Sequence, residues 1–162
     1  TNSGKELYRN YLIPITMVIS IMVLLINLIN YNFWQATGLT IINLIAMLIG
    51  NWFAYLITRE YLCRKLSFDT NLALNLTVYS GVIFIIFHSI GNALGNIFLG
   101  QLFTLLSFIF IRTLYKGLGQ IPRLHPGQKT NILVISSLAI ICIPVIINQL
   151  LMIIFGISAF NI

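Results

Sequence analysis

Five long apolar runs divide the chain, and short polar stretches separate them. Hydropathy places these runs at residues 11–29, 39–57, 72–90, 97–115 and 132–154. Each run is close to the ~20 residues with which an α-helix crosses the ~30 Å hydrocarbon core of a bilayer. Stretches such as IPITMVISIMVLLINLI lack the alternation of apolar and polar residues that a membrane β-barrel strand needs. The pattern therefore predicts an all-α integral membrane protein, a bundle of five transmembrane helices in one domain over residues 1–162.

Composition agrees with this interpretation. The 162 residues are 59% hydrophobic and only 7% charged, whereas soluble domains contain about 25% charged residues. The fourth run is the weakest of the five because Gly100, Gln101 and Arg112 reduce its apolar content. The first run has the length of a full span and no small-residue cleavage site after it, so we interpret it as a retained helix and not a signal peptide.

The charged residues predict the orientation of the bundle. They all lie before the first run, or at and between the ends of the second and third and of the fourth and fifth runs: Lys5, Glu6, Arg9, Arg59, Glu60, Arg64, Lys65, Asp69, Arg112, Lys116, Arg123 and Lys129. The connections NYNFWQATG and GNALGN and the tail GISAFNI have none. Because basic residues in short loops stay in the cytoplasm, we expect a cytoplasmic N-terminus and a C-terminus outside. The net charge of +6 then faces anionic lipid and does not indicate a nucleic-acid partner.

Polar residues inside the runs form stripes at helical spacing. In the second run, one helix face holds Asn43, Met47, Gly50, Asn51 and Ala54. Similar faces hold Thr77, Gly81, Phe84 and His88 in the third run, with Asn75 and Tyr79 beside them, and Ser137, Ile141, Pro144 and Asn148 in the fifth. The candidate intramembrane polar positions are Asn43, Asn51, Asn75, His88, Gln101 and Asn148.

These stripes fit either contacts between helices or a polar path for a solute. The runs have no Asp, Glu, Lys or Arg near their centres, so the usual proton relay or counter-ion is lacking. We therefore favour helix packing, and we interpret His88 as structural. Pro144 is expected to kink the last helix, because a proline leaves the carbonyl four residues earlier without its hydrogen bond.

Motifs for catalysis, a cofactor or a metal are not recognisable. The two cysteines, Cys63 and Cys142, are too far apart for a metal-binding or redox pair. Gly91 and Gly95 form a GxxxG pattern, but it lies between two runs, so a tight turn between helices is favoured over a dimer interface. The sequence predicts a protein that is not an enzyme and uses no cofactor.

The stretch GLGQIPRLHPGQK, residues 117–129, lies between the fourth and fifth runs. It is not a phosphate-binding loop, because Gln128 separates Gly127 from Lys129 and no strand precedes it. Thr130 or Asn131 is expected to cap the last helix. We interpret this connection as a candidate partner-docking loop, formed by Tyr115, Lys116, Gly117, Leu118, Pro122, Arg123 and Lys129.

Three segments resemble the Yip-domain family of membrane proteins, named for interaction with Ypt/Rab-type GTPases. The closest is IFIRTLYKGLGQIPRLHPGQKTNILVISSLAIICIPVIINQLL, and the others are LTVYSGVIFIIF and YRNYLIPITMVIS. The chain looks like the compact bacterial form of the family. The resemblance implies five spans with the same orientation, and contact with a GTPase follows from the resemblance alone.

We expect a non-catalytic membrane scaffold or accessory subunit of the Yip-domain type, which contacts lipid and either itself or another membrane protein. Its expected location is the bacterial inner membrane, with a eukaryotic endomembrane as the alternative. A second hypothesis is a small transporter, channel or lipid-handling protein that works as an oligomer. A third is a subunit of a larger energy-transducing membrane complex.

Overall fold

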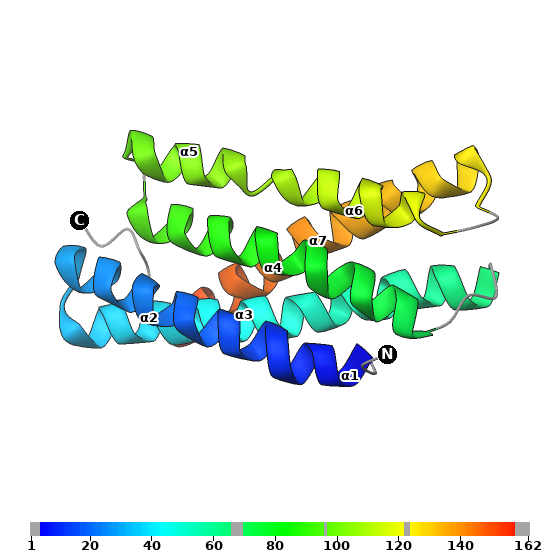
Figure 1. Cartoon of the computed structure of the whole chain (residues 1–162). Coiled ribbons are helices and arrows are strands. Elements are labelled where there is room, and N and C mark those ends of the chain that lie inside the picture. Colours follow the sequence, from blue (N-terminus) through cyan, green and yellow to red (C-terminus); the bar gives the residue numbers. More distant parts are fainter. Residues whose placement is uncertain (1–3, 66–69, 96, 122–123, 158–162) are drawn as a thin grey trace.

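The computed structural model describes residues 4–65, 70–95, 97–121 and 124–157. Over these residues the chain forms a bundle of helices without strands (Figure 1). The helices are α1 (Gly4–Leu7), α2 (Ile13–Asn30), α3 (Phe33–Arg59), α4 (Thr70–Leu94), α5 (Phe98–Leu106), α6 (Ile109–Gly119) and α7 (Pro126–Phe155). Two π-helical segments, Tyr8–Leu12 and Glu60–Lys65, join α1 to α2 and extend α3.

The prediction of five helices with the length and apolarity of a membrane span is confirmed for this part of the chain. The helical stretches that meet both criteria are Tyr8–Asn30, Phe33–Leu62, Thr70–Leu94, Phe98–Gly119 and Pro126–Phe155. Many large apolar side chains point outward, such as Ile21, Leu25 and Ile153. An outer surface of this kind fits a lipid environment, in which apolar side chains need not be hidden.

The two ends of the bundle differ in charge. At one end lie the end of α3, the start of α4, the end of α6 and the start of α7, and we call this the basic end (Figure 1). The helix α1 lies toward the same end. At the other end lie the connection between α2 and α3, the end of α4 and the start of α5, and we call this the uncharged end. The side chain of Ile157 lies there too, beside Gly38 of α3. Arg9, Arg59, Lys116 and Lys129 belong to the basic end, whereas residues 26–45 and 90–98 contain no Lys, Arg, Asp or Glu.

A π-helical turn explains how the first helix contains a proline. The N–H of Ile13 donates to the carbonyl of Tyr8, five residues earlier. Pro14 follows at once, in the first turn of α2. Since proline has no N–H to donate, the shift in hydrogen bonding just before it lets the helix continue upstream to Gly4.

The fourth span, Phe98–Gly119, contains a short break in its helix. α5 ends at Leu106 and α6 begins at Ile109. The hydroxyl of Ser107 donates to the carbonyl of Thr104 at 2.6 Å, and that of Thr104 to the carbonyl of Gly100 at 3.0 Å. Such bonds from side chain to backbone compete with the helical ladder and bend helices.

The last helix begins earlier than expected, at Pro126. His125 precedes it in an extended conformation, and its N–H donates to the side-chain oxygen of Gln128 at 3.3 Å. Proline is favoured at the first helical position because its missing N–H would be unpaired there anyway. The predicted cap at Thr130 or Asn131 is therefore wrong, since both residues lie inside α7.

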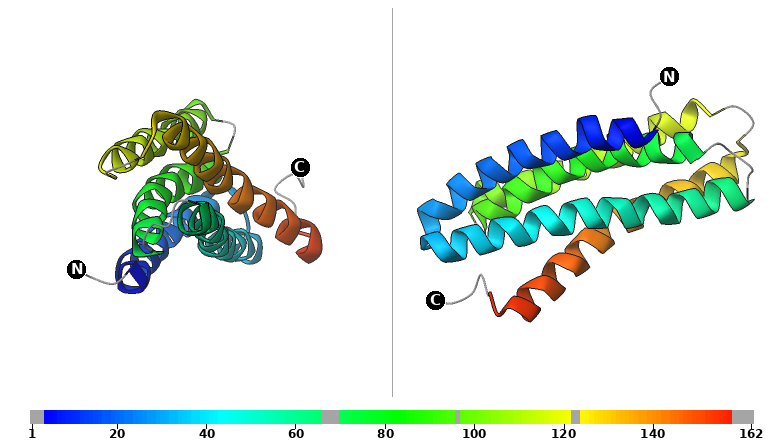
Figure 2. Two further views of the ribbon diagram at one scale, coloured as in Figure 1. Left: turned by 90° about the vertical axis from the view of Figure 1, so that its right-hand side faces the viewer. Right: turned by 90° about the horizontal axis from the view of Figure 1, so that it is seen from below.

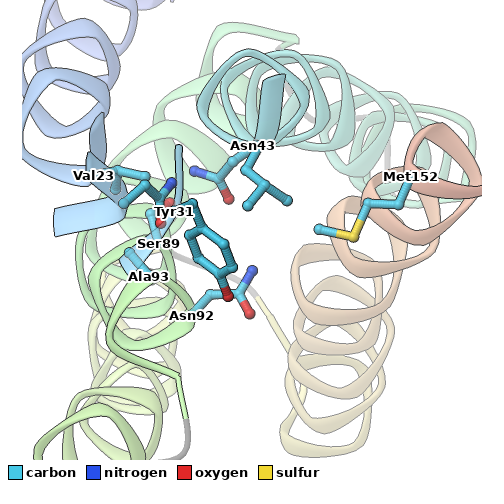
Figure 3. A pocket seen from close by; sticks show the side chains of 9 residues that line it. Val23, Tyr31, Asn43, Ser89, Asn92, Ala93 and Met152 are labelled. Carbon is cyan, nitrogen blue, oxygen red and sulfur yellow. The ribbon is translucent and has the colours of Figure 1, made fainter. Parts of the chain in front are cut away.

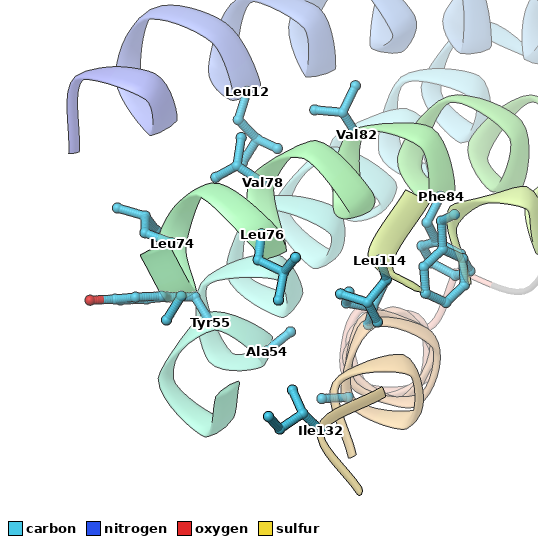
Figure 4. Close-up of a cluster of buried hydrophobic side chains, with 14 of the residues drawn as sticks. Leu12, Ala54, Tyr55, Leu74, Leu76, Val78, Val82, Phe84, Leu114 and Ile132 are labelled. Carbon is cyan, nitrogen blue, oxygen red and sulfur yellow. The ribbon is translucent and has the colours of Figure 1, made fainter. Parts of the chain in front are cut away.

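The most buried of the five spans is α4, which contacts α2, α3, α5, α6 and α7. Figure 2 shows it at the centre of the bundle, and the second half of α7, beyond Pro144, turns away from α5 and α6. The main core cluster gathers where these helices meet (Figure 4), and its fully buried members include Leu12, Met47, Phe84, Phe110 and Leu114. A smaller cluster of Ile19, Val23 and Ile90 lies between α2 and α4.

Two close helix contacts use glycine. A Cβ atom on Gly50 of α3 would lie 2.5 Å from Cγ and 2.6 Å from Cα of Pro144 on α7. Eight residues along each helix from this point, the hydroxyl of Thr58 donates to that of Ser136 at 3.0 Å. The two helices therefore run antiparallel, and the predicted polar face of α3 is the face that packs in the interior.

The second glycine contact joins α4 to α5, next to the turn between them. Gly95 has a φ of 64°, a left-handed conformation that glycine adopts readily. A Cβ on Gly91 would lie 2.8 Å from the backbone nitrogen of Thr104. Gly95 therefore lies in a turn as predicted, whereas Gly91 lies inside α4 and packs against α5.

Candidate functional site

A polar pocket lies inside the uncharged end of the bundle (Figure 3). Its volume is about 50 Å³, which exceeds the ~10–15 Å³ that one water molecule requires. The lining residues are Val23, Asn27, Tyr31, Leu39, Asn43, Ser89, Asn92, Ala93 and Met152. The pocket therefore has room for several waters or for a small polar group.

Four helices supply this lining. Asn27 and Asn92 lie in the last turns of α2 and α4, and Met152 in the last turn of α7, whereas Asn43 lies ten residues into α3. In Figure 3 Met152 stands on the far side of the pocket from Val23 and Ala93. At 1.5 Å of rise per residue, the pocket reaches roughly 15 Å inward from the start of α3.

The connection between α2 and α3 holds one wall in place. The side-chain amide of Asn27 donates to the hydroxyl of Thr40 at 3.2 Å, and both residues are buried. The carbonyl of Asn27 accepts from the N–H of Tyr31 at 2.8 Å. At the start of α3, the side chain of Asn32 accepts from the N–H of Gln35 at 2.9 Å, which caps that helix. This hairpin fixes Asn27 and Tyr31 relative to Asn43.

The pocket offers hydrogen-bond acceptors without a charged side chain. Amide and hydroxyl groups come from Asn27, Tyr31, Asn43, Ser89 and Asn92. The side chains of Asn43 and Ser89 are 5% and 1% exposed, and their Oδ1 and Oγ atoms have no hydrogen-bond partner among the described residues. A buried polar atom without a partner costs about 1–3 kcal/mol, so these two oxygens favour a bound donor.

The helix ends around the pocket add a negative potential. The carbonyl end of a helix carries about half a negative charge. The C-terminal turns of α2, α4 and α7 all line the pocket, and none of them contains a basic residue that would offset this charge. The electrostatics therefore favour a hydrogen-bond donor or a cation over an anion.

Packed side chains fill the bundle between this pocket and the basic end. Gly50 touches Pro144, and a Cβ on Gly81 would clash with the side-chain amide of Asn51. The amide of Asn51 donates to the carbonyl of Thr77 at 3.5 Å. Met47, Phe84 and Phe110 are at most 2% exposed. This part of the interior is a closed core.

The six polar positions predicted from the sequence are not gathered in one place. Asn43 lines the pocket, whereas Asn51 lies at the crossing of α3 and α4. The ring of His88 stacks on Phe84 with 4.7 Å between centroids, and Gln101 is exposed on α5. Asn148 is 4% exposed, and Asn75 is partly buried; neither Oδ1 has a partner among the described residues.

The predicted docking loop is mostly helical. Tyr115, Lys116, Gly117 and Leu118 belong to α6, and Lys129 belongs to the first turn of α7. Pro122 and Arg123 lie outside the described residues. The Nζ atom of Lys129 lies 4.7 Å from the ring centroid of Tyr115, so this cation–π contact joins α6 to α7.

Two members of this group face inward. Leu118 is 1% exposed and belongs to the core, and a Cβ on Gly117 would lie 2.5 Å from Cδ1 of Leu76 on α4. Tyr115 and Lys116 are exposed. The surface that a partner could touch at this end is therefore smaller than the sequence pattern indicates.

Asn27, Tyr31 and Asn92 were not predicted as site residues. Each lies at the end of an apolar run, where polar residues are expected simply because a helix is ending. The sequence nevertheless held a signal for them, because the connections at this end contain polar residues but no charged residue.

Comparisons of the chain with protein-family models, with curated proteins and with solved structures find no match.

Proposed function

We propose that the chain is a non-catalytic membrane scaffold or accessory subunit of the Yip-domain type, with five spans. The observation that carries this proposal is the closed core between the polar pocket and the basic end. Among the described residues, Met47, Phe84 and Phe110 pack into that interior, which argues against passage of a solute through a single copy. A protein built in this way acts through its surfaces and its pocket.

The proposed orientation has the N-terminus in the cytoplasm and the C-terminus outside. It is supported by the positions of Arg9, Arg59, Lys116 and Lys129 at one end of the bundle, because basic residues near span ends favour the cytoplasmic side. The proposed location is a bacterial inner membrane. A eukaryotic endomembrane would present the same charge asymmetry.

Single cysteines test the orientation directly. In a background with Cys63→Ser and Cys142→Ala, Asn32→Cys should react with a membrane-impermeant maleimide added to intact cells. Gln120→Cys, which is also exposed but lies at the basic end, should react only after the membrane is permeabilised. The opposite labelling pattern would refute the proposed orientation without affecting the five-helix fold.

The proposed partner is a second copy of this chain or another membrane protein. The Yip-domain resemblance adds a GTPase as a candidate at the basic end. Crosslinking in native membranes, followed by purification in a mild detergent, should yield a defined crosslinked species. A monodisperse monomer without a crosslinked product would contradict the scaffold proposal.

A transporter is the second candidate, and one observation favours it. The polar pocket opens a space of about 50 Å³ among neutral side chains. Of the residues predicted to line a path, namely Asn43, Asn51, His88, Gln101 and Asn148, only Asn43 lines that space. Transport would need a rearrangement or an oligomer, and flux in proteoliposomes that depends on Asn43 would support it.

A further inference from the structure

The scaffold proposal assigns no ligand to the polar pocket at the uncharged end. Its lining combines neutral oxygen-bearing side chains with the carbonyl ends of three helices. We propose that this pocket binds a primary ammonium group, supplied by the headgroup of a membrane lipid or by a free amine. This inference is independent of whether the protein acts as a scaffold.

The unpartnered oxygens indicate a ligand that donates hydrogen bonds. Asn43 Oδ1 and Ser89 Oγ are buried without a partner among the described residues, and both side chains line the pocket. Figure 3 shows the amide of Asn43 on α3 and the hydroxyl of Ser89 on α4 bordering the same space. An ammonium group carries three donors and no acceptor, which matches a lining with several neutral oxygens.

The charges around the pocket argue against an anionic ligand. The described residues of the lining include no Lys or Arg, and phosphate or carboxylate groups are normally held by these residues or by N–H groups. The three helix C-termini repel an anion and attract a cation. Among the described residues the lining also contains no carboxylate, so a divalent cation such as Mg²⁺ or Ca²⁺ would lack its usual ligands there.

Size and position favour a compact headgroup. The pocket of about 50 Å³ suits a small group, and a quaternary ammonium would instead call for a cage of aromatic rings. Within the described part of the chain, Tyr31 is the one aromatic residue of the lining. Asn27 and Asn92 lie within one turn of a helix end, at the level where lipid headgroups meet the apolar helices. Val23, Leu39 and Met152 give the pocket an apolar side as well.

The test compares two lipids that differ in the ammonium group alone. The full chain in mild detergent is titrated with phosphatidylethanolamine and with phosphatidylcholine of identical acyl chains, and bound lipid is counted by native mass spectrometry. We expect the ethanolamine lipid to bind about tenfold more tightly, because a hydrogen bond to a charged group is among the stronger polar contacts. Equal binding of the two lipids would overturn the proposal and leave a pocket that holds water.

Two matched pairs of variants locate the effect. Asn43→Leu should remove the preference, whereas Asn148→Leu should keep it, because Asn148 is equally buried and its Oδ1 equally unpartnered, but it does not line the pocket. Ser89→Ala and Ser80→Ala form a milder pair on α4, since both side chains are 1% exposed with an unpartnered Oγ and only Ser89 lines the pocket. Loss of the preference in the control variants to the same degree would refute the assignment.

The source of the amine is decided with a headgroup that lacks acyl chains. Glycerophosphoethanolamine should compete weakly if the pocket takes a lipid, since most of the affinity then comes from the chains. Competition at the same concentration as the intact lipid would identify a free amine as the ligand, and either result supports ammonium recognition. If glycerophosphocholine competed as well as glycerophosphoethanolamine, ammonium recognition would be contradicted.

Discussion

Buried asparagine, serine and threonine residues carry most of the polar chemistry of this bundle. The hydroxyls of Thr16, Ser20, Thr40 and Thr77 donate to the carbonyl four residues earlier in their own helix. These hydroxyls therefore donate within their own helix, and Thr40 also accepts from the amide of Asn27 on α2. Thr58 is different, because its hydroxyl crosses to Ser136 on another helix at 3.0 Å, and both side chains are at most 1% exposed.

A double-mutant cycle should detect this bond between helices. Thr58→Val and Ser136→Ala each remove one hydroxyl with little change in shape, and the pair should show a coupling of about 0.6 kcal/mol, the average for such bonds in membranes. The measurement is unfolding of the single and double variants in mixed micelles with increasing SDS. Strictly additive effects would show that the contact contributes no coupling energy.

The sequence predicted which face of α3 is buried, but it did not predict which way an isolated polar residue points. The face of α3 that holds Asn43, Gly50 and Asn51 is buried as expected, because helical spacing alone determines which residues share a face. Gln101 was expected inside but is exposed on α5. A single polar residue has no periodicity, so only its neighbours in space decide which way it points.

At the scale of helices, close approach depends on a few glycines. Gly50 lies against Pro144, where α3 crosses α7, and Gly91 lies against α5 near Thr104. Small residues at such crossings let backbones approach and gain dispersion contacts. The sequence pattern indicated that α3 has a small-and-polar face. It did not predict which helix packs against that face, because the other helices are all apolar and hydropathy does not distinguish them.

Adding one methyl group at Gly50 should therefore force α3 and α7 apart. A Cβ there would lie 2.6 Å from the backbone Cα of Pro144, and backbone atoms cannot rotate away. We expect Gly50→Ala to destabilise the fold by about 1–3 kcal/mol, the usual cost of overpacking, measured as a lower midpoint of unfolding in SDS.

Gly127→Ala supplies the control for this prediction. Gly127 also lies in a helix, and a Cβ there would have nothing within 4 Å. Alanine should be neutral or stabilise α7 by up to about 1 kcal/mol, because glycine is the poorer helix former. If the two variants behaved alike, helix propensity and not the contact between α3 and α7 would decide stability.

For the molecule as a whole, the number of helices followed from hydropathy, whereas the pocket did not. Five apolar runs of the right length leave little freedom, since a helix is one of the few structures that can satisfy its own backbone in lipid. The pocket arises because α2, α3, α4 and α7 come together around Asn27, Asn43 and Asn92. That arrangement depends on contacts between residues that are far apart in the chain.

The asymmetry of charge between the two ends gives the last prediction, because it should determine how the bundle inserts. Adding two lysines at the uncharged end, with Asn30→Lys and Gln35→Lys, should produce a mixture of orientations, since both ends would then favour the cytoplasm. Gln120→Lys and Asn131→Lys add the same charge at exposed positions of the basic end and should leave a single orientation. The readout is maleimide labelling of one added cysteine, Ile97→Cys, in the background without Cys63 and Cys142, before and after permeabilisation. Ile97 is exposed and precedes α5 at the uncharged end, so the first pair should lower its labelling in intact cells and the second should not. Equal labelling in both pairs would mean that contacts between helices, and not the basic end, set the orientation.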